Sequence, residues 1–467
     1  MEKILLLNPP GDKQYQRDMY CSGVSKGYYC WPPIDLLVQS GILGQKYDVE
    51  ILDAIGDKLT PEKCLSQIAS EDYTAILFLT GIASWKNDLA FMSRVAGYRK
   101  KRRPLIIGNG DILLYQSEQF LRDNDFLDAV LLDYTEDDII HYFEGNEDKI
   151  NAFAYRREGK IEIRHFPETS RRISFPIPHH EKLHAENYLL AQGKRFPFTT
   201  AMTNFGCPFN CSFCPASVLS YKFRPVDNIM EELRYIASLG FKEIFFTDFT
   251  FEAHRKNTLE LCRRMIRENL DLSWVCSSRA NTLNRKLLHY MKKAGCHTIL
   301  MGVESGDEKM LRKYSKGVTK DQVREAVSIC REIGIRILGH FIIGLPGETE
   351  KTVRKTISFA KELDCDIASF NIAVPALGTP LRKKALQEGW LSDASMELDS
   401  SASYPVLGTP TFSKEQAWYW QKKAVKEFYF RPAYIWKMAV SSQSYYQWKV
   451  LLSNGLALVR NFLFRRK

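Results

Sequence analysis

The sequence has no hydrophobic run long enough to cross a lipid bilayer, so a membrane-spanning protein is not expected. The apolar run at residues 4–7 is too short for the core of a signal peptide, and no small-residue cleavage site follows it. The eleven cysteines are odd in number and scattered, unlike the framework of a small secreted disulfide protein. Together these absences favour a protein of the reducing cytoplasm.

With 467 residues, the chain is too long for a single hydrophobic core, and two or three domains are expected. Its 45% hydrophobic and 26% charged residues are typical of a globular protein. The net charge of +10 is concentrated in residues 99–103, which are expected to be a solvated helix end, and in the aromatic-rich stretch after Phe428. That stretch is open to three interpretations: a helical cap on the core, a membrane-surface face or a nucleic-acid site. No nucleic-acid module is recognisable, so nucleic acid is not an expected partner.

Residues 1–145 alternate short apolar runs with helical patterns, which predicts a doubly wound, Rossmann-like α/β domain. The predicted strands lie at 4–8, 49–53, 75–80, 104–108 and 129–132, and the helices near 33–44, 61–70 and 86–101. Ligands of such sheets bind beyond the carboxyl ends of the strands. The loops that begin at Asn8, Asp53, Thr80 and Gly108 are therefore the candidate binding loops.

Residues 146–195 are expected to form a connector that contains a small hairpin, 152–156 with 160–165. From residue 196 to 390 the strand–helix alternation resumes, and six βα units predict a partial (β/α)6 barrel. Residues 391–467 are expected to form a small, mainly helical region. The barrel's elements are expected as strands at 197–204, 243–248, 272–277, 297–303, 336–343 and 368–374, and as helices at 226–239, 256–268, 285–294, 320–333 and 350–363.

Three cysteines follow the first barrel strand with the spacing C-x3-C-x2-C, namely Cys207, Cys211 and Cys214. Three thiolates can hold three irons of a cubic [4Fe–4S] cluster. Structural zinc would need a fourth ligand, but Pro215 comes next and the following cysteine is Cys262. The fourth iron would therefore stay open for chemistry. A zinc knuckle or a set of buried thiols is the alternative interpretation.

This cysteine spacing resembles that of the radical S-adenosylmethionine (SAM) superfamily. The resemblance implies that SAM binds the open iron through its amino and carboxylate groups. It also implies that one electron cleaves SAM to methionine and a 5′-deoxyadenosyl radical, which removes hydrogen from an unactivated carbon.

Segments that follow the later barrel strands resemble the SAM-contacting motifs of the same superfamily. The resemblance assigns SAM contacts to Asp248, Ser278, Arg279, Glu304 and Gly344. Many relatives have two consecutive Asp residues after the second strand, whereas here the second position is Phe249.

A Rossmann-like domain before this barrel resembles the subgroup with an N-terminal cobalamin-binding domain. The resemblance assigns cobalamin contacts to Asn8, Asp53, Thr80 and Gly108. No D-x-H-x-x-G motif is present, as is usual in that subgroup. Asn109 stands where relatives often have a second Gly, and Tyr134 interrupts a loop that relatives fill with Gly-Glu-x-Glu. A fold that is retained but no longer binds corrin is the alternative.

The region after the barrel resembles hopanoid methylases and the anaerobic cyclase of chlorophyll synthesis. This implies a cobalamin-dependent C-methyltransferase that acts on a large apolar lipid, tetrapyrrole or natural product, at a membrane surface contacted by the basic C-terminus. A reduced flavodoxin or ferredoxin is the expected electron donor. Two alternatives remain: a corrin-independent radical SAM cyclase or oxidoreductase, and a non-enzymatic iron–sulfur or zinc module. No catalytic acid or base can be named.

Overall fold

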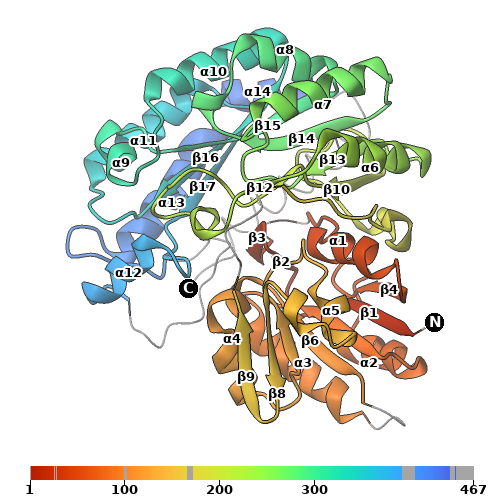
Figure 1. Cartoon of the computed structure of the whole chain (residues 1–467). Coiled ribbons are helices and arrows are strands. Elements are labelled where there is room, and N and C mark those ends of the chain that lie inside the picture. Colours follow the sequence, from red (N-terminus) through yellow and green to blue (C-terminus); the bar gives the residue numbers. More distant parts are fainter. Residues whose placement is uncertain are drawn as a thin grey trace. The chain divides into compact units, whose positions relative to one another are not determined.

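The computed structural model (Figure 1) describes residues 2–25, 27, 29–98, 103–165, 172–391, 405–441 and 448. The chain divides into two compact units, Met1–Ser25 with Cys30–Tyr188, and Lys26–Tyr29 with Leu189–Lys467. Most of the predicted basic run at 99–103, and all the basic residues from 449 onward, lie outside the described residues. No helix in the described ranges combines the length and apolarity needed to cross a membrane.

The first unit is built on a seven-stranded sheet with the order β4-β1-β5-β6-β7-β8-β9. Its first five strands are parallel, and their residues are almost all buried because helices cover both faces. This confirms the predicted doubly wound domain. The strands are β1 (Lys3–Asn8), β4 (Asp48–Asp53), β5 (Ala75–Leu79), β6 (Leu105–Asn109), β7 (Ala129–Leu131), β8 (Phe153–Arg157) and β9 (Lys160–Arg164).

The hairpin expected in the connector, β8–β9, belongs to this sheet. β8 pairs antiparallel with β7, so that Leu131 lies opposite Phe153. Phe153 and Ala154 are completely buried. Burying these apolar residues stabilises the hairpin against the sheet, so it forms the edge of the sheet in the first unit.

Besides the short helix α5, two features of this unit were not predicted from the sequence. One is a second hairpin after β1, formed by β2 (Tyr15–Asp18) and β3 (Cys21–Val24). The other is the helix α4, whose apolar residues Ile112, Leu113, Phe120 and Leu121 are buried at helical spacing. The helices of the unit are α1 (Ile34–Leu43), α2 (Pro61–Ser70), α3 (Trp85–Gly97), α4 (Asp111–Asp123) and α5 (Asp138–Phe143).

The second unit is built on a six-stranded parallel sheet with the order β10-β13-β14-β15-β16-β17. All neighbouring strands are parallel, so their carboxyl ends meet at one edge, as the predicted partial barrel requires. The strands are β10 (Phe198–Ala201), β13 (Glu243–Phe246), β14 (Ser273–Ser278), β15 (Cys296–Glu304), β16 (Arg336–Ile343) and β17 (Ile367–Ile372).

Helices connect these strands and form an outer layer around them in Figure 1. Local signals fix their starts: Thr319 and Gln322 form a capping box at α10, and Thr349 and Thr352 form another at α11. The helices are α6 (Val226–Ser238), α7 (Arg255–Arg267), α8 (Arg285–Lys293), α9 (Glu308–Lys313), α10 (Lys320–Ile333), α11 (Glu350–Leu363) and α12 (Pro380–Gln387).

Two helices after the barrel, α13 (Lys414–Tyr429) and α14 (Pro432–Ser441), cover the edge strand β17. The Tyr429 hydroxyl donates to the carbonyl of Ala368 (2.7 Å) and accepts from its N–H (3.1 Å). Gln421 donates to the carbonyl of Phe370 (3.2 Å), and Tyr434 donates to that of Asp366 (2.7 Å). These side chains satisfy backbone groups that an edge strand would otherwise leave unpaired.

Candidate functional site

The three cysteines lie in one loop that follows β10. The short strands β11 (Asn204–Phe205) and β12 (Lys222–Phe223) pair antiparallel and close this loop at its base. Its far side is held by two backbone hydrogen bonds, from Ser212 N–H to the Tyr314 carbonyl (3.1 Å) and from Leu381 N–H to the Ser212 carbonyl (3.0 Å). The loop is therefore fixed at the carboxyl edge of the barrel strands.

A cation faces the cysteine loop. Arg279 donates from Nη1 to Cys211 Sγ (3.1 Å), and its guanidinium stacks 4.0 Å from the centroid of the Phe209 ring. Cys207 Sγ lies 3.6 Å from Thr250 Oγ1. Burial, with a smaller contribution from the neighbouring Cys211 and Cys207, raises the pKa of Cys214 to about 12. Iron binding would thus displace a proton from Cys214, and Arg279 would offset the negative charge of the bound thiolates.

These residues fit an iron–sulfur cluster better than a single ion. No three His, Cys, Asp or Glu side chains of the described residues converge on a point that could hold one metal ion. The cysteines of a cubic cluster each bind a different iron, so they need not converge in this way. A loop that presents three thiols with a guanidinium beside them meets the cluster's requirements.

Asp248 follows β13. One of its carboxylate oxygens accepts hydrogen bonds from the chain, whereas the other accepts none from the described residues. Oδ1 accepts from the N–H groups of Thr203 (2.8 Å) and Asn204 (2.6 Å). Oδ2 is buried and has no hydrogen-bond partner among the described residues. Burial raises the pKa of Asp248 to about 7. An unpartnered buried oxygen at a strand end suits a ligand that brings a donor or a positive charge.

Ser278 is the last residue of β14 and Arg279 follows it, and both residues are at least 95% buried. The Arg279 N–H donates to Glu252 Oε1 (3.2 Å), which also accepts from the Thr282 hydroxyl. Burial raises the pKa of Glu252, while Ser278 beside it lowers the pKa. Glu252 therefore fixes the backbone turn that sends the Arg279 side chain toward Cys211.

Glu304 ends β15 in a left-handed backbone conformation, with φ +65°, where the register with β16 shifts. Its Oε1 accepts from Lys316 Nζ (2.8 Å) in a nearly buried ion pair. Gly302 makes room for this pair, because a Cβ there would lie 2.5 Å from Glu304 Oε1 and 2.7 Å from Lys316 Nζ. A non-glycine residue with positive φ is costly and is often found at ligand sites.

Gly344 follows β16 with φ +94°, a conformation that favours glycine. Its N–H donates to Glu348 Oε2 (2.5 Å), and burial raises the pKa of Glu348 to about 8. Gly344 thus forms a tight turn at the same edge as Asp248, Arg279 and Glu304, as the sequence predicted.

The sequence interpretation missed four side chains at this edge: Tyr221, Thr250, Glu252 and Lys316. Thr250 and Glu252 follow Asp248 in the same strand-end loop, and this proximity was an available signal. Tyr221 lies in the cysteine loop, and its hydroxyl is buried without a hydrogen-bond partner in the described part of the chain. Burial raises the pKa of Tyr221, and the charges of Asp248 and Cys207 add to this effect. Only the fold places Tyr221 and Lys316 here.

In the first unit, the predicted strand-end residues belong to a buried hydrogen-bond network. Asn8 donates to Asp53 Oδ1 (2.7 Å) and accepts from Arg17 Nη1 (2.9 Å). Thr80 donates to Asp88 Oδ2 (2.9 Å), and Arg17 binds both oxygens of Asp88 (3.0 and 2.6 Å). The side chains of Asn8, Asp53 and Thr80 are thus engaged within the chain.

The β2–β3 hairpin reaches the same strand ends. Gly81 packs closely against this hairpin, because a Cβ atom on Gly81 would lie 2.2 Å from Ser22 Oγ. Gly108 packs closely as well, because a Cβ atom there would lie 2.6 Å from Leu113. Asn109 Nδ2 donates to the Leu131 carbonyl (3.0 Å), while Asn109 Oδ1 is buried with no partner in the described residues. This strand edge therefore combines close packing with one unfilled hydrogen-bond acceptor.

The sequence model of the "Radical SAM superfamily" matches residues 203–360. An uncharacterized methyltransferase of Pyrococcus horikoshii is 31% identical over 445 residues, which cover 93% of this chain and 94% of that protein. The chain belongs to the radical SAM superfamily. It is accordingly a radical SAM enzyme that uses a [4Fe–4S] cluster and S-adenosylmethionine, as the cysteine spacing predicted.

Two further matches are to an anaerobic cyclase and to a solved radical SAM enzyme. The anaerobic magnesium-protoporphyrin IX monomethyl ester cyclase of Rubrivivax gelatinosus is 24% identical over 76% of this chain and 66% of that protein. The cobalamin-dependent radical SAM enzyme OxsB, solved with aqua-cobalamin and SAM, has the same fold with a TM-score of 0.74 and 15% identity. That match covers 99% of this chain and 72% of the other. The predicted fold class, a Rossmann-like α/β domain followed by a partial barrel and a helical C-terminal region, is confirmed.

Proposed function

We propose that this protein is a cobalamin-dependent radical SAM methyltransferase, which transfers a methyl group to an unactivated carbon of a large apolar substrate. The observation that carries the radical chemistry is the fixed cysteine loop with Arg279 on Cys211, beside the unfilled oxygen of Asp248. Methyl transfer is supported by the relative from Pyrococcus horikoshii, which is named a methyltransferase and matches nearly the whole chain.

In this proposal Cys207, Cys211 and Cys214 would hold the cluster, which would supply the electron needed for SAM cleavage. The chain's own side chains bind and orient SAM. Ionised Asp248 would accept a hydrogen bond from an N–H of the SAM amino group through Oδ2, and Glu304 would fix the polar end of SAM together with Lys316. Ser278 and Gly344 complete the polar edge. The barrel keeps water from the reacting carbon.

The first unit would hold cobalamin at the carboxyl ends of its parallel strands, where ligands of such sheets bind. Bound there, cobalamin would carry the methyl group. Asn109 Oδ1, the unfilled buried acceptor, offers it a hydrogen bond. Asn8, Asp53 and Thr80 shape the site through their network, and Gly108 allows α4 to pack closely behind it.

The second candidate is a corrin-independent radical SAM cyclase or oxidoreductase. The β2–β3 hairpin favours it, because Ser22 and the buried Arg17–Asp88 pair occupy space next to the strand ends of β1 and β5. In that case the first unit would serve as a scaffold.

One reconstitution experiment separates the two candidates. The protein is loaded anaerobically with iron, sulfide and hydroxocobalamin, desalted and examined by absorption spectroscopy. An iron–sulfur shoulder with corrin bands supports methyl transfer, and a product heavier by one methylene unit then establishes it. A shoulder without corrin bands supports the second candidate. Cysteine-to-Ala variants at 207, 211 and 214 should lose the shoulder and SAM cleavage, whereas Cys262→Ala, which changes a buried cysteine of α7, should keep both. Cleavage that survives complete cluster loss would contradict both candidates.

An apolar substrate presented at a membrane surface is part of the same proposal. Helix α14 exposes Ile435 (55%), Trp436 (71%) and Val440 (61%), which suit an interfacial helix of a cytoplasmic protein. Flotation with anionic liposomes tests this: the wild type should float with the vesicles, and a Trp436→Ser variant should float less. Equal flotation of the two would contradict a role for α14. A reduced flavodoxin or ferredoxin is the proposed electron donor.

A further inference from the structure

Basic side chains from three helices gather beside the cysteine loop. They form what we call the basic face: Lys309, Arg312 and Lys313 of α9, Lys351 and Lys355 of α11, and Lys383 and Lys384 of α12. All seven are exposed. Burial lowers the pKa of Lys313, and the charge of Lys384 lowers it further, which places the ends of α9 and α12 close enough for their cations to repel.

The basic face is attached directly to the loop that holds the cysteines. Tyr314, at the end of α9, accepts from Ser212 N–H (3.1 Å), and its ring packs against Phe213 at a centroid distance of 6.3 Å. Leu381 of α12 donates to the Ser212 carbonyl (3.0 Å). The outer side of the cysteine loop therefore lies between the two helices that carry most of these cations.

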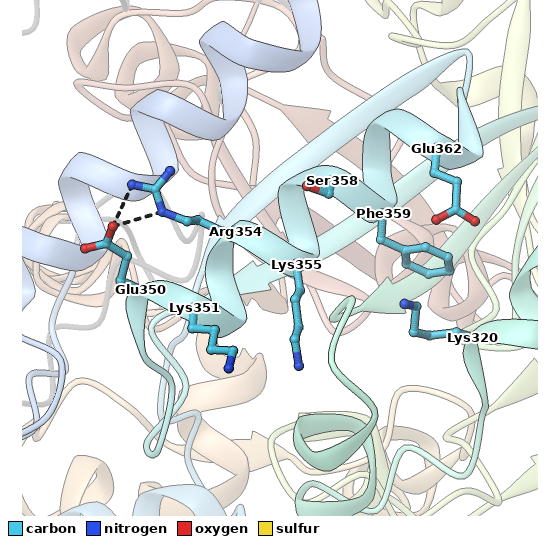
Figure 2. A pocket seen from close by; sticks show the side chains of 8 residues that line it. All are labelled: Lys320, Glu350, Lys351, Arg354, Lys355, Ser358, Phe359 and Glu362. Atoms are coloured by element: carbon cyan, nitrogen blue, oxygen red, sulfur yellow. Dashed lines mark hydrogen bonds and ion pairs between the residues drawn. The ribbon is translucent and has the colours of Figure 1, made fainter.

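Helix α11 extends the basic face through a hollow of about 650 Å³. Lys355 pairs with Asp307 (2.6 Å), the N-cap of α9, and so joins α11 to α9. In Figure 2 Lys351 and Lys355 extend to one side of α11, apart from the Glu350–Arg354 pair. Across the hollow, Lys320 Nζ lies 4.7 Å from the centroid of the Phe359 ring.

The carboxylates of these elements do not cancel the positive charge. Asp307 is engaged with Lys355, and Glu350 with Arg354 (2.6 Å). Glu308 accepts from the Lys320 N–H (2.7 Å) and lies 3.9 Å from Arg312, so it offsets one cation of the basic face. Burial raises the pKa of Glu348 to about 8, so it is largely uncharged near pH 7. Glu362 of α11 pairs with Arg324 (2.6 Å), and the exposed Glu388, directly after α12, adds one more negative charge. The seven cations still outnumber the charged carboxylates of these described elements.

We infer that the basic face is the docking surface for an acidic, one-electron carrier protein that reduces the cluster. The inference deepens the proposed function, on which it rests, because SAM cleavage needs an electron at the cysteine loop. Electron transfer weakens steeply with distance, so a protein donor must bind where that loop meets the surface. A positive surface attracts an acidic partner and accelerates its association about 10- to 1,000-fold.

The test compares two variants with the same change in charge. Lys309→Glu/Lys384→Glu alters the basic face at two side chains that form no ion pair with any described residue. Lys286→Glu/Lys293→Glu alters two exposed lysines of α8 and is the matched control. Each reconstituted protein is assayed for SAM cleavage with reduced flavodoxin, a small acidic flavoprotein, and separately with dithionite, which needs no docking surface.

The basic-face variant should raise the flavodoxin KM about tenfold or more, while dithionite-supported cleavage stays within about twofold of the wild type. The control variant should match the wild type in both assays. Raising the ionic strength should weaken the flavodoxin reaction of the wild type far more than that of the basic-face variant. Equal flavodoxin kinetics in the two variants, or a loss with dithionite as well, would overturn the inference.

Direct binding separates this inference from the proposed function. Flavodoxin binding is measured by titration calorimetry on each cluster-loaded protein. If the wild type binds flavodoxin and the basic-face variant does not, the docking surface stands even when no methylated product is found. Binding that is equal in both variants would overturn the docking surface and leave the proposed function untouched.

Discussion

Replacing Arg279 tests whether this side chain sets the electron affinity of the cluster. Its Nη1 lies 3.1 Å from Cys211 Sγ, and the side chain is 5% exposed, so the guanidinium acts on bound iron through protein rather than through water. Removing a positive charge disfavours the state that has gained an electron. Arg279→Gln should therefore make the cluster's reduction potential more negative.

The size of the shift follows from Coulomb's law. With the guanidinium about 6 Å from the cluster and an effective dielectric constant of about 20, the interaction with one added electron is about 3 kcal/mol. For a one-electron couple this corresponds to about 120 mV. Arg279→Lys keeps the positive charge but loses the planar guanidinium and its stacking on Phe209. The cluster potential in this variant should therefore stay within about 30 mV of the wild type.

An anaerobic redox titration followed by electron paramagnetic resonance measures these potentials without any substrate. Arg285→Gln removes an exposed guanidinium of α8, which pairs with Glu332 at 2.7 Å, and serves as the control with an expected shift close to zero. An unchanged potential in Arg279→Gln would refute the reasoning. So would a fall of the same size in Arg279→Lys, because that result would assign the effect to packing rather than charge.

Three further predictions concern SAM binding and stability. Gly302→Ala should weaken SAM binding about tenfold by displacing Glu304, and calorimetric Kd values check this; an unchanged Kd would contradict a role for Glu304. Because the pKa of Asp248 is raised to about 7, the carboxyl ionises as pH rises through that value. SAM affinity should rise over the same interval in the wild type and stay flat in Asp248→Asn; parallel profiles would exclude a direct contact. Asp88→Leu leaves Arg17 buried and unpaired, so urea unfolding of the first unit should show a loss of about 3–5 kcal/mol, and a loss below about 1 kcal/mol would contradict the role of the pair.

The barrel could be predicted closely because its elements carry local signals. The helices predicted at 320–333 and 350–363 begin and end where α10 and α11 do, since capping boxes fix their first turns. In the first unit, the buried apolar runs at 4–8 and 75–80 predicted β1 and β5 in the same way. The β2–β3 hairpin escaped prediction because its burial depends on Arg17 meeting Asp88, 71 residues away.

The sequence by itself predicted the three proposed iron ligands and the strand-end motifs, because their spacing along the chain is the chemical requirement. Tertiary structure alone decided which side chains meet them. Arg279 lies 68 residues from Cys211, and Lys316 reaches Glu304 only because Gly302 leaves space and β15 shifts its register there. The basic face likewise exists only where α9, α11 and α12 converge on the cysteine loop. Such contacts join residues far apart in the chain, and no local pattern encodes them.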